Sequence, residues 1–210
     1  AYCFGDQGAF FGEKMLMGLE TAKKALEFLM EKSGSRKNLE VDFFGGEPLL
    51  NFNVVKDAVA YGRELEKQYG KKIRFTMTTN AYHVTPEMEA FINAEMKNLV
   101  ISIDGRKEIH DAMRKTAGGR GSYDTVVKNA KELVKNRGGQ EYYIRGTFTV
   151  NNLDFSKDAE ALYDLGFDEI SLEPVVTGEK MALTKEHLDT LLKEYEKLAE
   201  YYERKKEEGK

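Results

Sequence analysis

Short apolar runs alternate with amphipathic segments along the chain, and this order constrains the fold more than any other feature. The apolar runs are rich in β-branched and aromatic residues, as is typical of buried strands. The segments between them carry apolar residues at three- and four-residue steps, the pattern of a helix that buries one face. Strands are predicted over residues 39–44, 73–79, 99–103, 142–150 and 169–172.

The predicted helices alternate with the strands almost without exception. The start near Thr85 is well marked, because Thr is a favoured N-cap and Pro86 and Glu87 suit the first helical turn. Alternation of this kind indicates parallel strands joined by right-handed helical crossovers. The other helices are predicted over 13–33 and 52–68, from Ser122, from Asp154 or Ser156 to Leu165, and from Thr184.

No linker or repeat divides the sequence, so we expect one α/β domain over residues 1–210. Five strands are too few for a closed eight-stranded barrel, whereas a partial barrel and an open sheet both fit.

The composition excludes several classes of function. A net charge of -4 gives no general attraction to nucleic acid or to an anionic membrane. No apolar run reaches the roughly 20 residues of a membrane span, and no signal peptide opens the chain. The single cysteine excludes an internal disulfide and fits a reducing compartment. We therefore expect a cytoplasmic protein without nucleic-acid or membrane partners.

The first predicted strand ends in an unusual turn. Gly45 and Gly46 leave bare backbone at the strand tip, where a ligand can approach closely. Glu47 then places one carboxylate at the tip, and such a group suits a cation, for example an ammonium. A strand-to-helix turn with a solvated Glu explains the same residues, and the sequence leaves both interpretations open.

Polar residues also follow the other strands, at the edge where parallel sheets bind ligands. Asn80 ends the second strand. Ser102 and Asp104 lie two residues apart, so they share a strand face, and a hydroxyl beside a carboxylate suits a ribose diol. Arg145 suits a carboxylate, which it can hold with two hydrogen bonds. Together with Glu47 the set matches an amino acid joined to a nucleoside, although strand ends are often polar because they meet solvent.

Cys3 stands between Tyr2 and Phe4 in a loop rich in turn residues. A lone cysteine is usually a small buried apolar residue. A thiolate is also the ligand of iron–sulfur clusters, but one thiolate cannot hold a cluster, so its partners would have to come from elsewhere.

The connection from Arg106 to Gly121 is long, and long ordered connections are usually functional. It contains His110, Asp111 and Arg114. A role toward a substrate and an ordering role within the loop remain open, and a local salt bridge is favoured for Asp111 and Arg114.

Four of these segments together resemble the motifs of radical S-adenosylmethionine (radical SAM) enzymes. Tyr2-Cys3-Phe4 is similar to the end of their three-cysteine loop. Gly45-Gly46-Glu47-Pro48 is similar to the Gly-Gly-Glu motif that binds the methionine ammonium. Thr79-Asn80 and Ser102-Ile103-Asp104-Gly105 stand where the superfamily has its third- and fourth-strand motifs.

Other segments resemble one subgroup of that superfamily. Ile109-His110-Asp111 with Arg114, followed by Gly119 to Tyr123, resembles peptide maturases that carry an extra cluster-binding (SPASM-type) domain. The stretches from Asn38 to Leu49 and from Arg145 to Asp158 resemble thioether-forming maturases of six-cysteine (SCIFF) peptides.

The resemblance implies a partial (β/α)6 TIM-like barrel of parallel strands, with residues 1–210 as the core domain. The first barrel strand, the first two cluster cysteines and the SPASM-type domain are then expected outside this sequence, and the isolated chain is expected to be inactive.

The resemblance also implies a [4Fe-4S] cluster and S-adenosylmethionine as cofactors, with Cys3 as a cluster ligand. Glu47 would hold the ammonium, Arg145 and Ser102 the carboxylate, and Asp104 with Ser102 the ribose. The remaining residues expected at the cofactor are Tyr2 and Phe4 beside the adenine, Gly45, Gly46 and Asn80.

The implied reaction is reductive cleavage of S-adenosylmethionine to a 5′-deoxyadenosyl radical. The radical would abstract hydrogen from a ribosomally made, cysteine-rich precursor peptide, and a cysteine sulfur would bond to that carbon. A flavodoxin- or ferredoxin-type protein would supply the electron. No residue stands out as a general base, so the catalytic residues remain unknown.

Three alternatives remain. A related enzyme could act on another peptide or protein, as in sulfatase maturation. The chain could be a non-catalytic α/β domain that binds a nucleotide or a peptide. A barrel hydrolase or aldolase would need a lysine, or a metal-binding carboxylate or histidine pair, at the strand ends, and none is convincing there.

Overall fold

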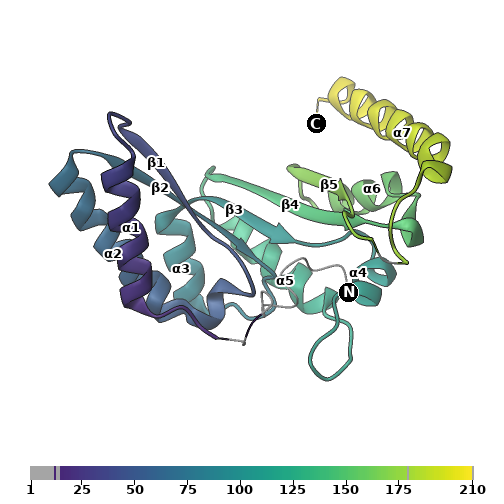
Figure 1. Ribbon diagram of the computed structural model, residues 1–210. Coiled ribbons are helices and arrows are strands. Elements are labelled where there is room, and N and C mark those ends of the chain that lie inside the picture. Colours follow the sequence, from purple (N-terminus) through teal and green to yellow (C-terminus); the bar gives the residue numbers. More distant parts are fainter. Residues whose placement is uncertain (1–11, 13–14, 179, 210) are drawn as a thin grey trace. The chain divides into compact units, whose positions relative to one another are not determined.

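The computed structural model describes residues 12, 15–178 and 180–209, so Tyr2, Cys3 and Phe4 lie outside the described residues. The strands form one sheet whose order follows the chain (Figure 1). The pairs β1–β2, β2–β3 and β4–β5 are parallel, which confirms the predicted α/β fold of parallel strands. The strands are β1 (Asn38–Phe43), β2 (Lys72–Thr79), β3 (Met96–Ser102), β4 (Glu141–Phe148) and β5 (Ile170–Pro174).

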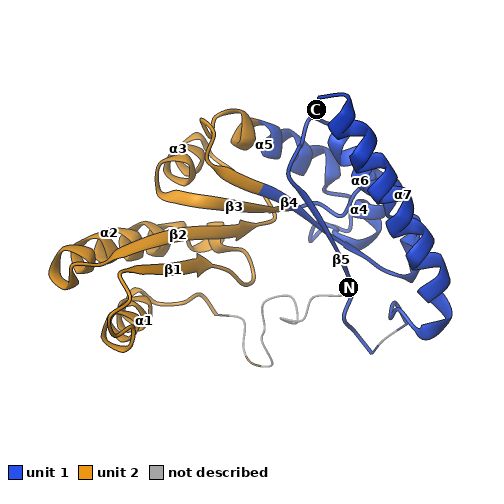
Figure 2. Cartoon of the chain, turned by 90° about the horizontal axis from the view of Figure 1, so that it is seen from above, with its two compact units in different colours: residues 1–2, 102–131, 143–210 blue, residues 3–101, 132–142 orange. Residues whose placement is uncertain are grey.

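The chain forms two compact units, which are coloured separately in Figure 2. Unit 2 comprises residues 3–101 and 132–142, and unit 1 comprises residues 1–2, 102–131 and 143–210. Chain order therefore does not separate the units, because the segment 132–142 returns to unit 2.

In unit 2, three helices lie along one face of the strands (Figure 1). They are α1 (Leu19–Lys32), α2 (Phe52–Tyr69) and α3 (Pro86–Glu95), and the short 3-10 helix η2 (Pro48–Asn51) precedes α2. Phe75 and Met77 of β2 are fully buried, and because they lie two residues apart they share one face of the strand.

Helix α1 begins later than the sequence predicted. Met15 was expected on its apolar stripe, but it precedes the helix and is 78% exposed. Gly18 stands at the N-cap with extended backbone, and glycine is a poor helix former, so the helix begins only at Leu19.

Arg137 is a buried residue that the sequence did not single out. It lies after α5 (Tyr123–Lys135), and its guanidinium donates to the carbonyl oxygens of Met96 and Glu141 at 2.9 and 2.7 Å and to Oδ1 of Asn93 at 3.2 Å. One side chain thus joins the end of α3 to the starts of β3 and β4.

Unit 1 has its own core around an aromatic cluster. Phe148 stacks on Phe155 with ring centroids 4.1 Å apart, and Tyr195 packs edge-on against both rings. The elements of this unit, besides β5 and parts of β4 and α5, are α4 (Lys107–Met113), η3 (Val150–Asn152), α6 (Ser156–Asp164), η4 (Lys185–His187) and α7 (Leu188–Glu207).

Two local predictions in unit 1 were wrong. The connection after Arg106 contains a helix, α4. Neither Asp154 nor Ser156 caps α6, whose N-cap is Phe155. Both polar side chains have other partners, since Asp154 pairs with Arg106 and the Ser156 hydroxyl donates to Glu194.

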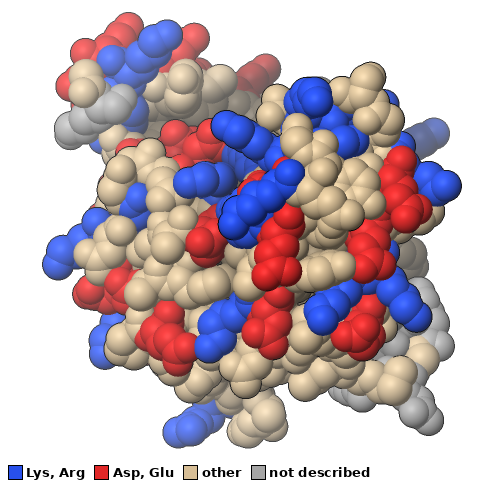
Figure 3. All heavy atoms as spheres, turned by 90° about the vertical axis from the view of Figure 1, so that its left-hand side faces the viewer, with Lys and Arg blue, Asp and Glu red and all other residues tan. Residues whose placement is uncertain are grey.

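Acidic and basic side chains are interspersed on the face drawn in Figure 3, which shows no large patch of one sign. Within the described residues, we find no helix with the length and apolar character needed to cross a membrane.

Candidate functional site

The loop after β1 places Glu47 at the carboxyl end of the sheet in unit 2. Gly45 and Gly46 adopt positive φ values of 98° and 55°, a region that favours glycine. The chain turns there and enters η2, for which Glu47 is the N-cap residue. The predicted glycine pair therefore serves to turn the backbone and present the Glu47 carboxylate.

Both oxygens of the Glu47 carboxylate accept hydrogen bonds. Oε1 accepts from the Thr79 hydroxyl at 2.8 Å and from the Leu49 N–H at 3.1 Å. Oε2 accepts from the Asn80 N–H at 2.7 Å. Asn80, expected at the cofactor, thus contributes its main chain here, and Glu47 joins the ends of β1 and β2.

Burial raises the pKa of Glu47, although the Asn80, Leu49 and Thr79 hydrogen bonds act in the opposite direction. Withdrawal from water makes the ionised carboxylate costly. A cation placed against it would offset that cost, so the Glu47 carboxylate suits an ammonium group.

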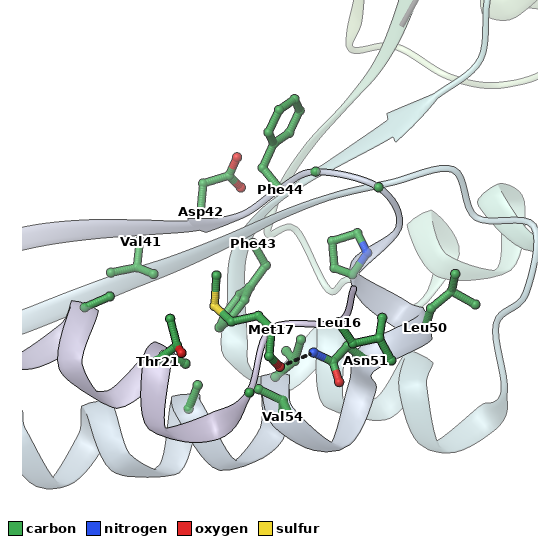
Figure 4. A pocket seen from close by; sticks show the side chains of 18 of the residues that line it. Leu16, Met17, Thr21, Val41, Asp42, Phe43, Phe44, Leu50, Asn51 and Val54 are labelled. Atoms are coloured by element: carbon green, nitrogen blue, oxygen red, sulfur yellow. Dashed lines mark hydrogen bonds between the residues drawn. The ribbon is translucent and has the colours of Figure 1, made fainter. Parts of the chain in front are cut away.

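A pocket of about 970 Å³ lies beside this loop, lined mainly by apolar side chains of α1, β1 and the start of α2 (Figure 4). Val41 and Phe43 lie on the helix side of β1, whereas Asp42 and Phe44 project from the other side (Figure 4). Phe44 is 48% exposed, and Asp42 accepts from the Thr76 hydroxyl at 2.8 Å. The end of β1 therefore has one apolar face toward the helices and one face with a polar pair.

In unit 1, Asp104 follows β3 and is buried. Its Oδ2 accepts from Arg114 Nε at 2.8 Å, and its Oδ1 accepts from Arg114 Nη2 and from the Thr147 N–H, each at 3.1 Å. Ser102 is the last residue of β3 and is half-buried. Contact of Asp104 with a ribose stays a prediction, because protein donors bind both of its oxygens here.

Arg145 on β4 pairs with Glu173 on β5, with 2.5 Å between Nη2 and Oε2. Their side chains are 40% and 44% exposed. Because exposed ion pairs contribute little free energy, a ligand carboxylate can replace Glu173 as the partner of Arg145.

Unit 1 contains a second ionic cluster, which the sequence did not indicate. Arg106 donates to Asp158 through Nε at 2.7 Å and through its main-chain N–H at 3.0 Å. Gly105, at φ 125°, lies against this cluster, and a Cβ there would come within 2.3 Å of the Asp158 Cβ. The Asp104-Gly105 pair after β3 was the only local signal, because Asp158 lies 52 positions after Arg106.

The predicted cofactor residues are thus distributed over both units. Glu47, with Gly45, Gly46 and Asn80, belongs to unit 2, whereas Ser102, Asp104 and Arg145 belong to unit 1. Thr79 binds Glu47 directly but was not among the predicted cofactor ligands, although it stands in the quoted Thr-Asn motif.

Two side chains, one in each unit, have the chemistry that the charged groups of a methionine need. The Glu47 carboxylate in unit 2 suits an ammonium, and the Arg145 guanidinium in unit 1 suits a carboxylate. Within residues 12, 15–178 and 180–209, no group of three or more His, Cys, Asp or Glu could hold a metal ion. The roles predicted for Cys3, Tyr2 and Phe4 lie outside the described residues.

Comparison with known proteins adds relatives of two kinds. A radical SAM cyclopropyl synthase, TigE, from Paramaledivibacter caminithermalis is 26% identical over 126 residues, which cover 59% of this chain and 25% of the synthase. A cysteine-type anaerobic sulfatase-maturating enzyme from Clostridium novyi is 28% identical over 155 residues, covering 73% of this chain and 38% of that enzyme. The chain thus spans well under half the length of these relatives.

Among solved structures, native anSMEcpe with bound AdoMet and the Kp18Cys peptide superposes with a TM-score of 0.84 at 19% identity. The match covers 99% of this chain and 57% of that one, and it shows a shared fold. The family model of the Radical SAM superfamily matches residues 1–160, more than half of the sequence. On this match, the chain belongs to the Radical SAM superfamily.

Proposed function

We propose that the protein is a radical SAM peptide maturase that forms a cysteine thioether cross-link in a ribosomally made precursor peptide. The observation that carries the cofactor part is the half-buried Glu47 carboxylate, held at the carboxyl end of the sheet by Thr79 and Asn80. The peptide part rests on the resemblance of residues 38–49 and 145–158 to maturases of six-cysteine peptides.

Radical SAM enzymes use a [4Fe-4S] cluster and S-adenosylmethionine. When bound, these groups supply a carbon-centred radical able to remove a hydrogen atom from an unactivated C–H bond. We assign one thiolate ligand of the cluster to Cys3, with Tyr2 and Phe4 beside the adenine.

In this proposal the chain binds and orients the cofactor through its two ends. Glu47 holds the ammonium, and the bare backbone of Gly45 and Gly46 allows close approach. Arg145 exchanges Glu173 for the carboxylate, and the Ser102 hydroxyl contacts the ribose or carboxylate. We assign no general base, since a thioether can form without one from this chain.

The bond changes in the peptide are simple. One C–H bond and one S–H bond are lost and one C–S bond forms, so the peptide loses two hydrogen atoms. One leaves as a hydrogen atom to the cofactor radical. The other leaves as a proton and an electron, and an iron–sulfur cluster, when bound, would be the acceptor of that electron. A flavodoxin- or ferredoxin-type protein in the cytoplasm supplies the electron that starts the reaction.

A second candidate is the maturation of a cysteine in a protein substrate. The Clostridium novyi relative, a cysteine-type anaerobic sulfatase-maturating enzyme, favours it. The two candidates share the cofactor site and differ in the substrate.

The cofactor part is tested with the full-length protein, purified without oxygen and reconstituted with iron and sulfide. After addition of dithionite and S-adenosylmethionine, mass spectrometry should detect 5′-deoxyadenosine. Cys3→Ala should abolish the product, and Glu47→Gln should lower it through weaker cofactor binding. A Cys3→Ala variant as active as the wild type would overturn the cluster assignment and leave the binding-domain alternative.

The substrate part is tested by incubating the same protein with a cysteine-rich precursor peptide and, separately, with a cysteine peptide from a sulfatase. Loss of two hydrogen atoms together with one alkylatable thiol supports thioether formation. Modification of the sulfatase peptide alone supports the second candidate.

A further inference from the structure

His110 is one of four residues that form a closed ring of hydrogen bonds in unit 1. The ring passes from the Asp104 main chain to His110, then to Ser122, Arg114 and back to the Asp104 carboxylate. The four links are Asp104 N–H to His110 Nδ1 at 3.4 Å, His110 Nε2 with Ser122 Oγ at 3.0 Å, Ser122 Oγ–H to Arg114 O at 2.6 Å, and the Arg114 guanidinium to Asp104.

The direction of these bonds defines the state of His110. A main-chain N–H can only donate, so Nδ1 must accept from Asp104 and carry no proton. The Ser122 hydroxyl donates to the Arg114 carbonyl, so it accepts from His110. His110 is therefore the neutral Nε2–H tautomer, and each donor in the ring has one acceptor.

The surroundings of the imidazole agree with this state. His110 is fully buried and lies edge-on to Tyr123, with ring centroids 5.6 Å apart. Burial, together with nearby Arg114, lowers the pKa of His110 to about 4, against the opposing effects of Asp104 and Asp111. The imidazole of His110 therefore stays neutral throughout the physiological pH range.

The ring reaches the predicted ligand residues through the backbone. The Asp104 carboxylate accepts from the Thr147 N–H, and the Ile103 N–H donates to the Arg145 carbonyl at 3.0 Å. Ser102 immediately precedes Ile103, and Arg145 lies two residues before Thr147. The end of β3, which carries Ser102, and the part of β4 that carries Arg145 are thus fixed to each other by Asp104 and its neighbour.

We propose that the Asp104–His110–Ser122–Arg114 ring is a positioning device that holds Ser102 and Arg145 in register for the cofactor, with Asp104 acting through the backbone. This inference rests on the proposed function and deepens it. It gives Asp104 a different role from the direct ribose contact expected from the sequence, and it assigns a role to His110 and Arg114.

The first test measures S-adenosylmethionine binding by equilibrium dialysis on the reconstituted full-length protein. Ser122→Ala and His110→Ala each remove a link, and the dissociation constant should rise roughly threefold to tenfold. His110→Gln should recover most of the affinity, because its side-chain amide can still donate to Ser122 Oγ. Arg63→Gln should leave the affinity unchanged, since Arg63 is a comparable ion-paired arginine in unit 2, with 31% exposure against 27% for Arg114.

A double-mutant cycle separates positioning from direct contact. If Asp104 acts through the ring, Asp104→Asn and Arg114→Gln should each weaken binding, and the double variant should be little worse than either single variant. Weaker binding in Asp104→Asn, with Arg114→Gln and Ser122→Ala unchanged, would show direct contact and overturn the proposal. Equal weakening by Arg63→Gln would also overturn it.

Nitrogen-15 NMR of the histidines gives a readout that does not depend on the cofactor. His110 should show one neutral Nε2–H signal from about pH 8 to about pH 5. If His110 titrates near pH 6.5, or shows an Nδ1–H tautomer, the hydrogen-bond ring described here is wrong. A wild-type protein that fails to bind S-adenosylmethionine but shows the single tautomer would overturn the proposed function and leave the ring intact.

Discussion

At the scale of the residue, Glu47 was predictable because the turn that carries it is local. Four consecutive residues, two glycines, the glutamate and Pro48, define that turn, whereas the distant Thr79 and Asn80 hold the carboxylate. Asp104 was only half predictable. Its position after β3 follows from the sequence, but Arg114 reaches it across α4, a helix that the sequence did not predict.

Glu47 should make cofactor binding depend on pH. Its pKa in the free protein is raised, so it takes up a proton at a higher pH than an exposed glutamate. Ammonium binding needs the ionised form, so affinity for S-adenosylmethionine should fall as the pH is lowered through that pKa. Glu47→Gln should bind roughly tenfold or more weakly at neutral pH and lose this dependence.

Equilibrium dialysis at a series of pH values on the reconstituted protein measures both effects. Thr78→Ser, a neighbour on β2 that is not bonded to Glu47 in the described contacts, serves as the control. Parallel pH profiles for wild type and Glu47→Gln would contradict the assignment of Glu47 to the ammonium.

At the scale of the element, helix ends marked by side chains were predicted and those fixed by distant partners were not. Thr85 is the N-cap of α3 and accepts from the Met88 N–H at 3.2 Å, as the sequence indicated. The N-cap of α6 was mispredicted because Asp154 and Ser156 bond to residues 48 and 38 positions away. Sequence distance, more than residue type, limits such predictions.

The Thr85 cap predicts a moderate loss of stability on substitution. Thr85→Ala removes the acceptor for one N–H at the start of α3 and should cost about 1 kcal/mol. Thr85→Ser keeps the hydroxyl and should cost much less. Urea denaturation followed by circular dichroism measures both variants, and equal midpoints for the two would show that the cap contributes nothing.

Substitution of Arg137 should cause a larger loss of stability. Its guanidinium donates to the carbonyl oxygens of Met96 and Glu141, so Arg137→Gln leaves the buried Met96 carbonyl without this donor. We expect a cost of roughly 2–4 kcal/mol by urea denaturation. Arg36→Gln, at a site exposed to solvent, is the control and should change the midpoint little. If the urea midpoint of Arg137→Gln equals that of Arg36→Gln, the Arg137 hydrogen bonds do not contribute to stability as proposed.

At the scale of the molecule, alternation of strands and helices was enough to predict a parallel sheet, whereas the division into units was not predictable. The boundary passes through β3 and β4, and residues 132–142 return to unit 2. No composition change marks that return, because it depends on contacts such as those of Arg137 with the start of β3.

His110 should make the stability of the molecule depend on pH. Its folded pKa of about 4 lies below the ordinary value of 6.5, so the unfolded chain binds a proton first as the pH falls. Stability should therefore decrease between about pH 6.5 and pH 4, by up to roughly 3 kcal/mol from this group.

His110→Gln cannot titrate, so the difference in unfolding free energy between wild type and variant should shrink or reverse across this range. Urea denaturation at several pH values measures it, with His83→Gln, at an exposed histidine, as the control. A difference that stays constant from pH 7 to pH 4 would contradict the lowered pKa of His110.

The order of the sheet has a consequence for synthesis of the chain. Each strand from β1 to β5 is adjacent in the sheet to the strand that precedes it in the sequence. A new strand can therefore pair as soon as it leaves the ribosome, with no need to wait for later residues or displace earlier ones. Loop closure at each step spans one crossover connection, which keeps its entropic cost modest. The sheet is thus suited to growth in one direction, from β1 toward β5, at the pace of translation.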